Sequence, residues 1–225
     1  MRAQWKPAVS VWSDYDDASE PVQRDAALKE QFVAEVCATQ SWSTVWDLGC
    51  NRGRYSRIAA RHADLVVAMD ADHLTVDRLF QKLCEDRVPN VVPLVMNLAD
   101  PTPSQGWRGV ERRELAQRSQ PQLVLCLALI HHLVIGSNLL LNDVLDWLAS
   151  LHCDVVLEFV DRSDPQVQIL LANRRDIFSD YSESAFRHAI QSHFSIAREQ
   201  VLNSGTRTLF LLRPLRDKGN GQSHE

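Results

Sequence analysis

Short apolar runs alternate with helical patterns along most of the chain. The runs are rich in Val and Leu and too short for helices, and they predict strands at Thr44–Leu48, Leu65–Met69, Val91–Val95, Leu123–Ala128 and Val155–Val160. Between them, the segments Asp72–Glu85 and Asn138–Leu151 each carry an apolar stripe at helical spacing. Strands that recur with helices between them predict βαβ units and a parallel sheet. Because the runs do not alternate with polar residues, we expect helices on both faces of that sheet.

The C-terminal part of the chain breaks this alternation. Phe194–Leu202 and Thr206–Leu212 are two strand-like runs separated only by Asn203-Ser204-Gly205. So short a connection can join only antiparallel strands. We therefore expect an α/β fold whose last strand runs against the others.

The remaining segments set the expected boundaries. Residues 1–20 are polar with scattered aromatic residues and predict an N-terminal arm or lid. Glu20-Pro21 opens a helix, because proline fits the first turn, where its missing N–H costs nothing. We expect one domain over residues 21–213 and a flexible tail over residues 214–225.

Composition narrows the classes of protein. The chain has 225 residues, a net charge of -5, 45% hydrophobic and 24% charged residues, which is typical of one soluble globular domain. Its five cysteines are odd in number and form no CxxC pair, which argues against disulfides or a zinc site and predicts a cytoplasmic protein. The longest apolar run, Leu123–Ile130, is too short to span a membrane, and Met1–Ser10 lacks the apolar core of a signal peptide. An acidic chain does not favour nucleic acid as a partner.

The most informative segment is the turn after the first predicted strand. Asp47-Leu48-Gly49-Cys50-Asn51-Arg52-Gly53 leads from that strand into a helix. Gly49 and Gly53 let the backbone approach a ligand closely. Asp70 ends the second strand, where an acidic residue can accept hydrogen bonds from both ribose hydroxyls. Asp47 lies before the first glycine, where a carboxylate suits a positively charged group. A ligand with a positively charged amino-acid end and an adenosine end therefore fits, and S-adenosylmethionine (SAM) is such a ligand.

This segment resembles motif I of the class I SAM-dependent methyltransferases, whose usual form is acid-x-Gly-x-Gly-x-Gly. The middle glycine is replaced by Asn51, and asparagine is one of the few residues that tolerate a positive φ. The resemblance covers roughly residues 25–213 and implies a doubly wound, seven-stranded, mostly parallel sheet with an antiparallel last strand. The alternative is a Rossmann-like domain that binds a different nucleotide.

The resemblance also implies further cofactor-binding residues. Asn97, after the third strand, would accept a hydrogen bond from the adenine amino group, with Asp100 as the alternative. Leu127 and Ala128, at the end of the fourth strand, would lie beside the methionine part. Tyr55 would close over the carboxylate end, or else be a surface aromatic residue of its helix. S-adenosylhomocysteine (SAH) would be the product.

The candidate catalytic groups are His131 and His132, which follow the fourth strand. In open α/β sheets the site lies beyond the carboxyl ends of the strands, so we expect these histidines near the transferable methyl group. His132 matches a histidine of the ubiquinone-biosynthesis type of O-methyltransferase and would act as the general base. The alternative is that His132 caps a helix or packs under the cofactor. We predict no metal site, because Ala128 and His131 stand where that group can place carboxylates.

Two residues are candidates for binding the acceptor. Glu158 is a polar residue in an otherwise apolar strand, and it faces either the substrate or a structural arginine partner. Trp107 stands in the long polar connection 101–121, for which we predict a short helix over Glu111–Arg118. Loops of this length are usually functional, so 101–121 is a candidate substrate lid, and a surface excursion is the alternative.

The sequence therefore predicts a methyltransferase that acts on a small molecule or natural product, at oxygen, with histidine-assisted deprotonation. The His131-His132 pair and the Gly-Trp-Arg loop also resemble a little-characterised bacterial branch of the family that includes nodulation-related proteins. A peptide, protein or tRNA acceptor is one alternative, and a catalytically silent SAM-fold protein that binds a partner is another. The oligomeric state is left open.

Overall fold

The computed structural model describes residues 20–172, 177–178 and 180–215, with side chains from residue 25 onward. The expected arm falls outside the described residues except for residue 20, and so does the expected tail except for residues 214–215.

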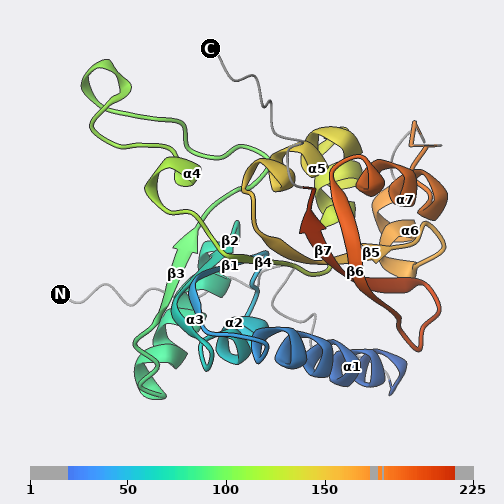
Figure 1. The fold of residues 1–225 in the computed structure, drawn as a ribbon, viewed down its shortest axis with the longest axis horizontal. Helices are drawn as coiled ribbons and strands as arrows, with labels where there is room; N and C mark the ends of the chain where they lie inside the picture. Colours follow the sequence, from blue (N-terminus) through green and yellow to red (C-terminus); the bar gives the residue numbers. More distant parts are fainter. Residues whose placement is uncertain (1–19, 173–176, 179, 216–225) are drawn as a thin grey trace, which may run out of the picture.

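A seven-stranded sheet forms the centre of the molecule, in the order β3-β2-β1-β4-β5-β7-β6 (Figure 1). The pairs β1·β2, β1·β4, β2·β3 and β4·β5 are parallel, whereas β7 is antiparallel to both β5 and β6. The predicted mostly parallel sheet with an antiparallel last strand is thus confirmed. The strands are β1 (Trp42–Leu48), β2 (Ala63–Asp70), β3 (Val91–Val95), β4 (Leu123–Cys126), β5 (Asp154–Val160), β6 (Phe194–Val201) and β7 (Arg207–Pro214).

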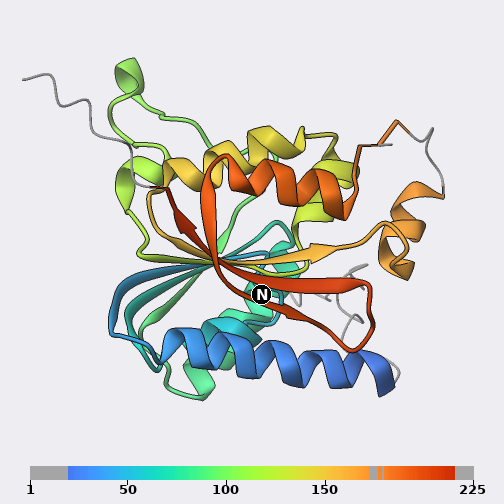
Figure 2. The same cartoon turned by 45° about the vertical axis from the view of Figure 1, so that its right-hand side comes forward.

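Helices cover both faces of the sheet, as the unalternated apolar strands predict (Figure 2). One apolar core, which includes Phe32 and Leu79, lies under α1 and α3, and the other, which includes Phe159 and Phe186, lies under α5 and α7. Within the described residues, no helix combines the length and the apolar character that a membrane span requires. The α-helices are α1 (Glu20–Cys37), α2 (Arg54–Ala59), α3 (His73–Glu85), α4 (Leu115–Arg118), α5 (Leu141–Ser150), α6 (Pro165–Leu171) and α7 (Glu183–Gln191).

The connection between β3 and β4 projects from the body of the molecule (Figure 1). It contains a 3-10 turn, η1 (Trp107–Gly109), and a bridge between Gln105 and Arg112. The predicted helix over Glu111–Arg118 is shorter in the structure and begins at Leu115, because Arg112 is held in the bridge. Trp107 is 78% exposed, so it does not pack on the sheet.

Candidate functional site

The carboxyl ends of four neighbouring strands meet at one edge of the sheet. Leu48 of β1 pairs with Met69 of β2 and with Cys126 of β4, and Asp70 of β2 pairs with Val95 of β3. The residues that follow these strands are therefore brought to the same edge. The strand order reverses between β1 and β4, and open α/β sheets bind their ligands at this kind of switch point.

The loop between β1 and α2 follows a path that L-amino acids rarely adopt. Gly49, Asn51 and Gly53 have φ values of 71°, 46° and 73°. A Cβ on Gly53 would lie 2.4 Å from Leu79 Cδ1, so α3 packs directly against the loop backbone. Asn51 adopts the left-handed conformation that its place in the motif requires.

Asp70 fixes this loop and retains capacity to bind a ligand. Its Oδ2 accepts a hydrogen bond from the Asn51 N–H at 2.9 Å, and its Oδ1 accepts one from the Asp72 N–H at 2.9 Å. Burial raises the pKa of the Asp70 carboxyl above its usual range. A carboxylate has about four acceptor positions, so each oxygen can still accept from a ligand hydroxyl.

A second acceptor at the loop has no partner within the described chain. The Oδ1 atom of Asn51 is buried and accepts no hydrogen bond from any described residue. A buried polar atom is normally paired with protein, water or ligand. This oxygen therefore fits a ligand that carries hydrogen-bond donors.

Asp47 lies behind the loop and is 1% exposed. Its Oδ2 accepts a hydrogen bond from the Ser56 hydroxyl at 2.5 Å, which ties β1 to α2. Burial raises the pKa of Asp47 to about 6. The carboxylate expected to attract a cation is thus covered by protein on all sides.

The other expected cofactor-binding residues lie along the same edge. Tyr55 is half-buried in α2, and burial raises the pKa of its phenol. Asn97 is exposed after β3, and its Oδ1 accepts a hydrogen bond from the Ala99 N–H at 3.0 Å. Leu127 is 5% exposed and Ala128 is half-buried, directly after β4.

The two histidines after β4 lie against each other, with ring centroids 4.1 Å apart and planes inclined by 40°. His131 is fully buried, and neither ring nitrogen has a hydrogen-bond partner among the described residues. Burial lowers the pKa of His131 to about 2, and repulsion from His132 when that ring is protonated adds to the effect. Burial also lowers the pKa of the half-buried His132 to about 4, with a contribution from Arg207. Both imidazoles are therefore neutral at pH 7.

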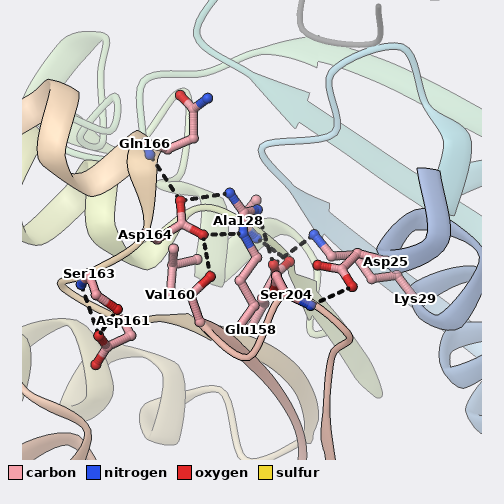
Figure 3. Close-up of polar contacts among 12 residues, drawn as sticks. Asp25, Lys29, Ala128, Glu158, Val160, Asp161, Ser163, Asp164, Gln166 and Ser204 are labelled. Atoms are coloured by element: carbon pink, nitrogen blue, oxygen red, sulfur yellow. Dashed lines mark hydrogen bonds and ion pairs between the residues drawn. The ribbon is translucent and has the colours of Figure 1, made fainter. Parts of the chain in front are cut away.

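Glu158 is fully buried and its carboxylate is engaged by three groups. Its Oε1 lies 2.6 Å from Lys29 Nζ, and its Oε2 accepts a hydrogen bond from the Ala128 N–H at 2.9 Å (Figure 3). The Oε1 atom also lies 3.3 Å from Arg207 Nη1. Of the two expectations for Glu158, the arginine pair is the one that the structure shows. The sequence carries no signal for Lys29 and Arg207 as partners of Glu158, because they come from α1 and β7, and no local pattern links them to β5.

No protein-family model matches the sequence of the chain, but a nodulation protein is similar to most of it. Nodulation protein NoeA of Rhizobium meliloti (strain 1021) is 34% identical over 202 residues, which are 89% of this chain and 42% of NoeA. The chain thus spans less than half the length of this relative.

Solved structures of methyltransferases share the arrangement of the whole domain. N-methyltransferase NodS of Bradyrhizobium japonicum WM9, in complex with SAH, has a TM-score of 0.61 and 9% identity, covering 90% of this chain and 96% of NodS. Magnesium protoporphyrin IX methyltransferase (ChlM) of Synechocystis PCC 6803, with bound SAM, has a TM-score of 0.55 and 20% identity, covering 89% and 88%. The chain therefore has the fold of the class I SAM-dependent methyltransferases.

Proposed function

We propose that the chain is a SAM-dependent methyltransferase that methylates a small molecule at oxygen. The observation that carries the proposal is the loop after β1. Its left-handed residues Gly49, Asn51 and Gly53 lie at the switch point of the sheet, and the Asp70 carboxylate accepts from the Asn51 N–H. The SAH and SAM found in NodS and ChlM agree with this ligand.

The residues present fit this cofactor. Asp70 would accept hydrogen bonds from the ribose hydroxyls, and the buried Oδ1 of Asn51 supplies a further acceptor that needs a donor. Asn97 would lie at the adenine, Leu127 and Ala128 at the methionine part, and Tyr55 at its carboxylate end. Asp47, whose carboxylate is covered, would act through Ser56 and α2, which shape the loop. When bound, SAM supplies a methyl group on a positively charged sulfur, ready for in-line displacement.

His132 would take the proton from the acceptor hydroxyl. Its lowered pKa of about 4 keeps it neutral near pH 7, as a general base must be. His131, buried against it, would hold the ring of His132 in place. Glu158 would not contact the acceptor, because its carboxylate is fully buried. Trp107, on the exposed connection, would contact the acceptor if that connection closes over the site.

A small-molecule acceptor agrees with two further findings. The chain carries a net charge of -5, which disfavours a nucleic-acid acceptor. The structural neighbour ChlM is named for its action on magnesium protoporphyrin IX, a small molecule.

Transfer of a labelled methyl group from SAM to a panel of phenols, sugars, hydroxy acids and amines tests the proposal. We expect a hydroxyl compound to be labelled. His132→Ala should lower turnover about 10²–10⁴-fold, the usual cost of losing a general base, and change SAM affinity less than about tenfold. His131→Ala should have a smaller effect. Labelling confined to amines, or full turnover in His132→Ala, would contradict the oxygen chemistry.

A further inference from the structure

The backbone turns sharply where the chain leaves β4. Ala128 has a φ of 48°, in the left-handed region that residues with a Cβ rarely adopt. Its N–H donates to Glu158 Oε2 at 2.9 Å. A residue from the neighbouring strand β5 therefore holds this conformation, and the turn leads directly to His131 and His132.

A set of buried charges keeps Glu158 in place. Lys29 and Arg207, with side chains 10% and 13% exposed, both approach Glu158 Oε1. Arg207 also binds Asp164, with Nε 2.8 Å from Oδ2 and Nη2 3.1 Å from Oδ1. Two cations thus face two carboxylates, which compensates for the cost of burying charge.

We infer that Glu158 is a positioning residue that sets the turn at Ala128 and, through it, the edge of the site where the cofactor and His132 meet. This inference rests on the proposed function. Glu158 acts through the backbone of Ala128 and does not touch the reactants. The cations Lys29 and Arg207 orient the carboxylate so that its second oxygen faces the Ala128 N–H.

Asp164 provides a matched control within the same charge cluster. Its carboxylate accepts hydrogen bonds from Arg207, from the Thr206 hydroxyl at 2.8 Å and from the Gln166 N–H at 2.9 Å, at the start of α6. No contact links Asp164 to Ala128 among those that the structure describes. Asp164→Asn therefore removes one buried charge without removing the acceptor for the turn.

The test compares Glu158→Gln and Asp164→Asn by NMR amide exchange at Ala128 and by calorimetric titration with SAH. In Glu158→Gln, the amide oxygen is drawn to Lys29 and its NH2 group faces the Ala128 N–H. We expect amide exchange at least tenfold faster and SAH affinity at least tenfold weaker. In Asp164→Asn both quantities should stay within threefold of wild type, although both variants are expected to melt at lower temperature.

A rescue variant separates positioning from general stability. Lys29→Met removes the cation nearer to Glu158 Oε1, at 2.6 Å, and the Arg207 that remains lies farther away, at 3.3 Å, and is also held by Asp164. In Lys29→Met/Glu158→Gln the amide oxygen can therefore turn to Ala128, and both quantities should recover to within threefold. It also serves if Glu158→Gln alone does not fold. Equal effects of Glu158→Gln and Asp164→Asn, or no recovery in the double variant, would overturn the inference. If wild type bound no SAH, the proposed function would fail, and amide exchange would still decide whether Glu158 holds the turn.

Discussion

The imidazole of His131 is an unusual group to bury without a partner. Its two nitrogens are covered and accept or donate no hydrogen bond within the described chain. An unpaired buried polar group costs about 1–3 kcal/mol. A residue that lowers stability in this way, beside the proposed base, is typical of a position kept for the site and not for the core.

Replacing His131 should make the free energy of unfolding fall less steeply as pH falls below 7. Its pKa is about 2 in the folded protein, below the usual 6.5 of an unfolded chain, so the unfolded state binds a proton that the folded state does not. The part of the unfolding free energy that depends on this titration is fully present above pH 6.5 and is lost as pH falls toward 2. Between pH 7 and pH 5, His131→Leu should lose about 2 kcal/mol less unfolding free energy than wild type, at about 1.4 kcal/mol per pKa unit.

Urea unfolding at a series of pH values measures this difference. Asp47 has the opposite sense, since its raised pKa stabilises the fold at low pH and this contribution is lost as pH rises through about 6. Asp47 makes this contribution in wild type and in His131→Leu, so it cancels when the two are compared. His188→Leu, at an exposed position of α7, is the matched control for a histidine-to-leucine change away from the site. An unchanged slope in His131→Leu would contradict the prediction.

The role proposed for His132 as general base implies that the rate of the reaction also depends on pH. Because burial lowers the pKa of His132 to about 4, kcat/KM should stay level from pH 8 to about 5 and fall below that. The rates of wild type and His132→Ala across this range measure the effect, and the acidic fall should vanish in the variant. A fall centred near pH 6.5, retained in His132→Ala, would assign it to another group.

At the scale of secondary-structure elements, the conformation of the loop between β1 and α2 depends on Gly53, the N-cap of α2. Gly53 combines a positive φ with close packing against Leu79 of α3. Gly205 also has a positive φ, of 70°, but a Cβ at that position would meet no atom within 4 Å. A comparison of alanine substitutions at the two glycines therefore separates the cost of backbone strain from the cost of steric overlap.

Alanine substitution at both positions measures the two effects. Gly205→Ala should lower the unfolding free energy by about 1–2 kcal/mol, the cost of a left-handed residue with a Cβ. Gly53→Ala should lower it by about 1–3 kcal/mol more, because the methyl group overlaps Leu79. Chemical denaturation gives both values. Equal losses would show that α3 yields to the added group.

The elements that could be predicted are those with a local signal. The strands are apolar runs, and the loop is marked by Gly49, Gly53 and the acidic residue that ends β2. Helix α6, capped by Asp164, and α7, capped by Ser182, carry local capping signals that periodicity alone does not use. The cluster of Lys29, Glu158 and Arg207 had no such signal, because its members come from three distant elements and meet only once the sheet has formed.

In the whole molecule, the buried charges join the first and last described elements at the site. Lys29 belongs to α1 and Arg207 to β7, and both meet at Glu158 beside the end of β4. On the other side of β4, Asp70 and Asn51 hold the loop after β1. The fold thus brings the loop after β1 and the turn after β4 to either side of the switch point, where the proposed cofactor would bind.

Calorimetric titration of wild type and Asp70→Asn with SAH shows whether the loop after β1 binds the cofactor. We expect one site of micromolar affinity for SAH and none for NAD. In Asp70→Asn we expect the binding free energy to weaken by about 1–3 kcal/mol, because the amide cannot accept from the backbone and from the ribose at both atoms. Binding of NAD in place of SAH, or SAH affinity that is the same in both proteins, would contradict it.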